Sequence, residues 1–194
     1  GPSPPALPGI DLCKERQLEL LEQMRRIAID LPDFNAGSFR YRYQVKSSPM
    51  PLAEALSLHL MLRVVAPKRI AEIGSSQGRA VILDTIERNF KQGIEVGSEW
   101  RHLAGGDVLY LESPQIDQLC FEVLPALSAG VYIQLRPISY PFRNAHLLRA
   151  FLMYNREFQI RFWPSFLYQH VRDRLAAIPQ ICADTGALWI RKVG

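Results

Sequence analysis

The segment RIAEIGSSQGRA, which runs from Arg69 to Ala80, decides the fold of this chain. Its first five residues form a short, mostly apolar run, which predicts a buried strand. Gly74 allows the backbone to turn tightly, Gly78 lets the next segment lie close to the strand, and residues 79–90 have the apolar spacing of a helix. A glycine-rich turn between a strand and a helix can direct backbone N–H groups toward a polar ligand. This turn is therefore the first candidate site.

Strands and helices are predicted to alternate in both directions from this segment. Further strands are predicted at residues 107–112, 131–135, 158–162 and 187–192, and helices at 11–29, 48–66, 116–127, 143–154 and 164–177. Alternation at 39–43 favours a short strand, whereas 91–101 has the pattern of a loop with one helical turn at Glu99 to Leu103. The pattern predicts an α/β fold with a Rossmann-like, mainly parallel sheet that is covered on both faces.

A single domain is predicted, with a short lead-in before it. Residues 1–10 hold four prolines and two glycines, which favours an extended segment, and the initial Gly1-Pro2 resembles a scar left by removal of a tag. Residues 11–194 then form the domain. Its first part, 11–66, is predicted to be helical, and 67–194 to be the Rossmann-like core.

Composition argues against several classes of protein. No apolar run approaches the roughly 20 residues needed to cross a bilayer, so no membrane attachment is expected. The three cysteines, Cys13, Cys120 and Cys182, are far apart and odd in number, which argues against a disulfide framework and predicts a cytoplasmic location. No Cys or His spacing suits a metal ion, so no metal is expected. The net charge is +4, but the arginines are scattered, which argues against nucleic-acid binding.

The turn and its flanking blocks resemble the class I S-adenosylmethionine-dependent methyltransferases of the bacterial small-molecule type. The turn is similar to motif I of that family, an acid-x-Gly-x-Gly-x-Gly loop. Further blocks with this resemblance are LHLMLRVVAPKRIAEIGSSQGRAVILDT, LAGGDVLYLES, FEVLPALSAGVYIQL and TGALWIRKV. The resemblance implies a C-terminal antiparallel hairpin made of 158–162 and 187–192. It also implies that, if cofactor binding survives, S-adenosylmethionine would contact the turn residues Glu72, Gly74, Ser75, Ser76 and Gly78.

The chain departs from the family pattern at the cofactor side of the cleft. Ser76 stands at the middle glycine position. In the family, a second strand ends in an acid that binds the ribose, and a helix and a third strand follow. That unit needs about 25 residues, and no room for it is found after residue 91, where Glu95 is the only acid before Gly97. We therefore expect a shortened sheet that lacks the second and third family strands.

Two strand ends on the substrate side also differ from the family. Glu112-Ser113-Pro114-Gln115 stands where members usually have Asp-Ser-Ser/Thr-His, and Arg136-Pro137 stands where they usually have His-Asp. The family acid and histidine that could act as bases are thus replaced. Glu112, Ser113 and Arg136 become candidate residues of an altered cleft. Glu112 and Arg136 are predicted to form an ion pair that is structural rather than catalytic.

Three hypotheses of function follow. The leading one is a degenerate methyltransferase, without a bound cofactor, that acts as a structural or accessory subunit. The first alternative is an active methyltransferase that uses S-adenosylmethionine in an abbreviated site completed by oligomerisation. The second alternative is a repurposed enzyme that uses the old cleft, although no nucleophile–base pair is visible. Loss of two strands would expose an edge of the first strand, so we expect a homo-oligomer or a complex with a larger protein through that edge.

Overall fold

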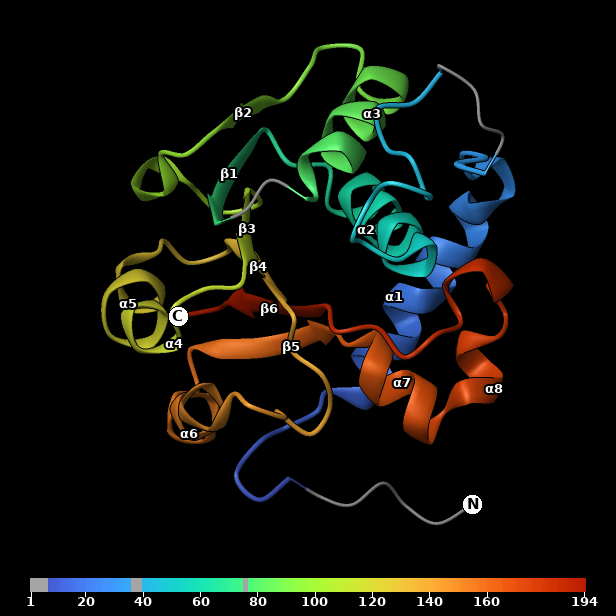
Figure 1. The fold of residues 1–194 in the computed structure, drawn as a ribbon. Coiled ribbons are helices and arrows are strands. Elements are labelled where there is room, and N and C mark those ends of the chain that lie inside the picture. The colour runs from blue at the N-terminus through green and yellow to red at the C-terminus, as the bar shows by residue number, and fades with distance from the viewer. Residues whose placement is uncertain (1–6, 36–39, 75–76) are drawn as a thin grey trace.

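Six strands form one mixed sheet, with helices on both of its faces (Figure 1). The computed structural model describes residues 7–35, 40–74 and 77–194. In spatial order the strands are β2, β1, β3, β4, β6 and β5. Their bounds are β1 Arg69–Gly74, β2 Glu95–Gly97, β3 Val108–Glu112, β4 Tyr132–Arg136, β5 Phe158–Phe162 and β6 Leu188–Lys192. The first four strands in that order are parallel, and β6 is antiparallel to both of its neighbours.

The helices lie in two groups, with α1, α2 and α3 on one side of the sheet and α4, α5 and α6 on the other (Figure 1). Their bounds are α1 Lys14–Ile27, α2 Leu52–Val65, α3 Arg79–Asn89, α4 Ile116–Gln118, α5 Leu124–Ala126, α6 His146–Tyr154, α7 Pro164–His170 and α8 Arg172–Leu175. A π-helical turn, Leu119–Val123, joins α4 to α5, and 3-10 turns lie at Ala28–Asp30, Trp100–His102 and Pro179–Ile181. None of the helices in the described ranges has the length and apolar character needed to cross a membrane.

Burial of the central strands explains their apolar sequences. Every residue of β3 is buried, and in β4 only Tyr132 is partly exposed. Parallel strands that are covered on both faces have continuous apolar runs, because water reaches neither face. The prediction of a mainly parallel α/β sheet covered on both sides is confirmed.

The C-terminal antiparallel pair is also confirmed. In this pair Phe158 lies opposite Lys192 and Ile160 opposite Ile190, with a register shift before Phe162. The alternating burial of β5, with apolar residues inward, is the period-two pattern from which the strand was predicted. The helix predicted over 164–177 is divided into α7 and α8 because Val171 has a non-helical backbone, with φ of −143°.

The structure corrects the prediction for the edge of the first strand. Residues 95–97, predicted as part of a loop, form β2, which pairs in parallel with Arg69 to Ala71. A strand therefore lies next to β1 on this side. The expectation that both the second and the third family strands are missing from the sheet is wrong for the position beside β1. Arg69 contributes to the pairing, since its Nε donates to Glu95 Oε2 at 3.2 Å. A strand of three residues is too short for its periodicity to be read, which is why the prediction was wrong.

A second correction concerns the aromatic and basic stretch at 39–43. Phe39 lies outside the described residues, and none of residues 40–43 is in a strand, with Arg40 in a turn and Arg42 in a bend. Two backbone N–H groups here, those of Arg42 and Tyr43, bind a side chain instead of a neighbouring strand. Asp84 on α3 accepts from the N–H of Arg42 at 3.0 Å and from that of Tyr43 at 2.9 Å. The alternating pattern arises because Tyr43 points into the core while Arg42 reaches Glu87 at the surface.

Candidate functional site

The first glycine of the turn after β1 lies in close contact with the neighbouring strand. Gly74 has φ of +105°, a backbone conformation that side chains rarely adopt. A Cβ at this position would overlap the backbone carbonyl oxygen of Glu112, at the end of β3. Gly74 is therefore required by the close approach of two strand ends. Ser75 and Ser76, which the resemblance assigns to the cofactor, lie outside the described residues.

The last glycine of the turn has a similar explanation. A Cβ on Gly78 would overlap the ring of Tyr110, which is fully buried in β3. The start of α3 thus lies directly against an aromatic side chain. Both described glycines of the motif are explained by packing within the chain, so neither requires a cofactor.

The structure confirms the predicted ion pair between the ends of β3 and β4. Glu112 and Arg136 are paired in register on adjacent strands, so their side chains leave the same face of the sheet. The Nη1 of Arg136 binds Glu112 Oε1, and its Nε binds Glu54 Oε1 on α2. All three side chains are buried, with residue exposures of 2% for Glu112, 3% for Glu54 and 7% for Arg136.

Gln77 connects this buried pair to the turn. Arg136 Nη1 also donates to Gln77 Oε1 at 3.0 Å, and the backbone N–H of Gln77 donates to Glu112 Oε2 at 3.0 Å. We name Glu54, Gln77, Glu112 and Arg136 the buried network. It joins α2, the turn before α3, and the ends of two central strands.

In the buried network the guanidinium of Arg136 faces two carboxylates, those of Glu54 and Glu112, and these charges affect its pKa. Burial opposes the charged form of Arg136, but the hydrogen bond and charge of Glu54 outweigh it and raise the pKa of Arg136. Burial and the charge of Glu112 raise the pKa of the nearby Tyr110 hydroxyl. The guanidinium therefore stays charged and engaged. It is a structural cation that offers no proton for catalysis.

Sequence reasoning missed Glu54. The signal was present, because this single acid lies in the mostly apolar helix LAEALSLHLMLRVV. An acid on the buried face of a helix needs a partner, since an unpaired charge in the interior is costly. Its partner is 82 residues away along the chain, so no local pattern identified it.

Glu72, the predicted acid of the motif, lies on the same face of the sheet. It is paired in register with Tyr110, and its side chain is largely buried. Arg79 Nη1 lies 3.0 Å from Glu72 Oε2, but in the described part of the chain neither carboxylate oxygen has a hydrogen bond of good geometry. Burial raises the pKa of Glu72, the charge of Arg79 lowers it, and Glu112 adds to the rise. Among the motif residues that the structure describes, Glu72 is the one with unused hydrogen-bonding capacity.

A further acid follows β2. Glu99 lies two residues beyond the end of β2 and begins the turn Trp100–His102, with its side chain exposed. Because β1 and β2 are parallel, their carboxyl ends point toward the same edge of the sheet. The family acid that binds ribose also follows a second strand. Glu99 was predicted only as part of a helical turn, because β2 was not recognised.

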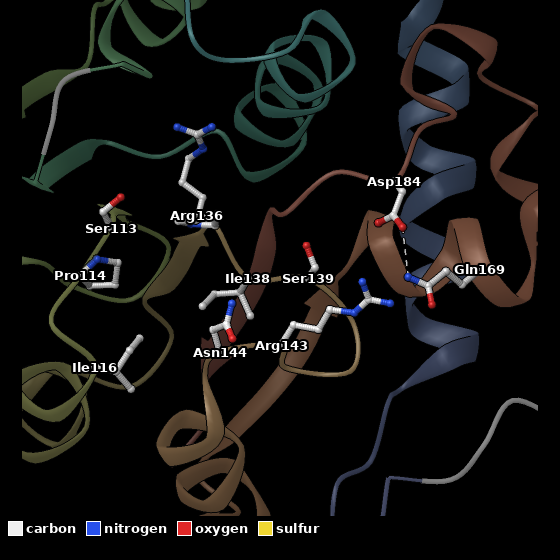
Figure 2. Close-up of a pocket in the computed structure, with 11 residues that line it drawn as sticks. Ser113, Pro114, Ile116, Arg136, Ile138, Ser139, Arg143, Asn144, Gln169 and Asp184 are labelled. Carbon is white, nitrogen blue, oxygen red and sulfur yellow. Dashed lines mark hydrogen bonds between the residues drawn. The ribbon is translucent and has the colours of Figure 1, made fainter.

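Ser113 lies beside a hollow of about 680 Å³ at the carboxyl ends of β3 and β4 (Figure 2). Its backbone has φ of 49°, and its N–H donates to the carbonyl oxygen of Arg136 at 2.7 Å. Arg136 borders the hollow, but its guanidinium points away from it toward α2 (Figure 2). The three predicted cleft residues are therefore neighbours, although the two charged ones serve the buried network and Ser113 alone faces the hollow.

The described residues provide no metal centre, because no three His, Cys, Asp or Glu side chains among them are grouped suitably.

Comparison of the chain with protein-family models, with curated proteins and with solved structures finds no match. The resemblance to methyltransferases therefore depends on the motif and the neighbouring blocks of the sequence and stays a prediction.

Proposed function

We propose that this chain is a methyltransferase-like protein that does not bind S-adenosylmethionine productively and that acts as a structural or accessory subunit. The observation that carries the proposal is the buried network. In open parallel sheets, ligands bind over the carboxyl ends of the strands. Here the ends of β3 and β4 are joined there by Glu112, Arg136 and Gln77, and α2 closes over them through Glu54.

Opening this region for a cofactor would be unfavourable. A ligand that displaced Gln77 would remove a hydrogen bond from each of Glu112 and Arg136. Buried charges that lose partners are destabilised, because water cannot replace the lost bonds. Glu112 and Arg136 also stand where the family has residues with acid or base chemistry. In this chain the two side chains form an ion pair with each other.

Titration with S-adenosylmethionine tests this proposal. Isothermal titration of the purified chain with S-adenosylmethionine, and separately with S-adenosylhomocysteine, is expected to show no saturable binding up to about 1 mM. The reason is that the buried network occupies the region the cofactor would need. A dissociation constant in the micromolar range for either ligand would contradict the proposal.

One observation favours the active methyltransferase as a second candidate. β2 is present and parallel to β1, and Glu99 follows its carboxyl end. If S-adenosylmethionine binds, Glu99→Gln should weaken it by about tenfold, since a carboxylate that bonds ribose hydroxyls would be lost. Glu95→Gln is the matched control, because Glu95 pairs with Arg69 near the other end of β1. Equal effects of both changes would argue against a ribose role for Glu99.

The accessory role requires a partner surface, and we propose the edge formed by β2 and the end of β1. β2 pairs only with Arg69 to Ala71, so in the described structure the stretch Glu72 to Gly74 has no strand on that side. The N–H of Glu95 donates to the carbonyl oxygen of Lys68, on the β1 side of β2. Successive N–H groups of a strand point to opposite sides, so the N–H of Val96 faces outward. Unpaired edges of this kind favour pairing with another chain.

Molar mass in solution tests pairing through this edge. We expect light scattering after size-exclusion chromatography to give twice the 22.1 kDa of one chain. Val96→Pro should shift the protein toward the monomer, because proline removes an outward-facing donor. Val96→Ala, which keeps that donor, should not. A monomer at all concentrations would contradict self-association through this edge.

A further inference from the structure

The hollow beside Ser113 has an apolar end and a charged end (Figure 2). Pro114 and Ile116 line one end, and Arg143 and Asp184 lie toward the other, with Ile138 between them (Figure 2). Its volume of about 680 Å³ lies within the range of pockets that hold small molecules. Arg136 borders this space, but its guanidinium points away from it, and Glu54, Gln77 and Glu112 do not line it. The buried network therefore does not fill the hollow.

The loop that carries Arg143 is held firmly by its neighbours. Phe142 is fully buried, and its ring centroid lies 4.7 Å from that of Trp163. The backbone N–H of Tyr140 donates to Ser165 Oγ at 3.0 Å. Phe142 and Asn144, on either side of Arg143, have φ of 69° and 59°, an unusual conformation for residues other than glycine. Such local strain is found preferentially at functional sites, where the surrounding packing maintains it.

Arg143 and Asp184 carry opposite charges but do not bind each other. In the described residues the Arg143 guanidinium makes no ion pair, and neither does the Asp184 carboxylate. Asp184 is positioned by Gln169, whose Nε2 donates to its Oδ2 at 3.1 Å. One carboxylate oxygen and the whole guanidinium fork are thus available at the same end of the hollow.

We propose that this hollow binds a small zwitterion with an apolar tail, such as a hydrophobic α-amino acid. Arg143 would hold the carboxylate, because its planar fork matches two carboxylate oxygens. Asp184 would accept from the ammonium group. The tail would lie along Ile138 toward Ile116 and Pro114. This inference goes beyond the proposed accessory role and does not depend on it.

Binding of L-leucine and two of its derivatives tests the proposal on the intact chain. N-acetyl-leucine lacks the ammonium group, and leucinamide lacks the carboxylate. Followed by ¹⁵N NMR, L-leucine is expected to shift the Arg143 and Asn144 resonances saturably. Each derivative should bind about tenfold more weakly, because one charged hydrogen-bonding group is lost.

Two variants assign each charge to its partner. The Arg143→Gln variant should bind L-leucine and leucinamide equally, because it lacks the guanidinium that distinguishes a carboxylate from an amide. Asp184→Asn should likewise bind L-leucine and N-acetyl-leucine equally, while Gln169 can still donate to the new amide. Arg101→Gln, an exposed change beside β2, is the control and should leave binding unchanged.

Three results would overturn the proposal. One is the absence of saturable shifts with L-leucine up to about 10 mM. Another is equal binding of all three ligands by the unmodified chain, a result that needs no variant to fold. The third is a saturable response whose shifts lie away from Arg143 and Asp184.

Discussion

Replacement of Arg136 by methionine is expected to lower the free energy of unfolding by about 3–5 kcal/mol, as in other proteins where one partner of a buried ion pair is removed. The change leaves Glu54 and Glu112 in the interior without a counter-charge. Gln77 would also lose the donor that its side-chain oxygen binds. Urea denaturation at about pH 7, with the unmodified chain measured in parallel, gives the difference.

Two controls accompany this variant. Combining Arg136→Met with Glu54→Gln and Glu112→Gln should recover much of the lost stability, because no unpaired charge remains inside. Arg25→Met removes an exposed partner of Glu22 and should have little effect, because solvent screens such surface pairs. If the triple variant is as unstable as Arg136→Met alone, the network does not stabilise the chain through its charges.

The sequence was sufficient to predict the parts of the fold that have a local signal. The turn from Arg69 to Ala80 identified the first strand and its helix, and β5 has the predicted bounds. Glu112 and Arg136 were identified as partners because each ends a strand that could be recognised from its own residues. When two such strands are neighbours in a parallel sheet, their ends meet at one edge. That inference needs no knowledge of distant contacts.

Features that depend on docking of distant elements could not be predicted in this way. Glu54 reaches Arg136 only because α2 lies over the ends of β3 and β4. Arg143 and Asp184 come to one hollow through a loop after β4 and a loop before β6. β2 has three residues, which is below the length at which alternation differs from chance. In each case the deciding contact is long in sequence and leaves no periodic pattern.

Replacement of Gly74 by alanine is expected to lower the free energy of unfolding by about 2–6 kcal/mol. The left-handed backbone at φ +105° contributes about 1–3 kcal/mol of this for a residue with a side chain. Overlap of the new methyl group with the Glu112 carbonyl oxygen contributes about 1–3 kcal/mol or more. The overlapped atom belongs to the backbone of a buried strand, so it cannot move aside as the end of a flexible side chain could.

Gly97→Ala is the matched control for this change. Gly97 also lies in a strand of the sheet, but a Cβ there meets no atom within 4 Å, and its φ is not positive. Because alanine loses less backbone freedom on folding than glycine, this change should be neutral or slightly stabilising. Chemical denaturation of both variants under one set of conditions measures the difference. Equal stability of the two would mean that Gly74 is not held against the end of β3, and the packing explanation of the motif would then be wrong.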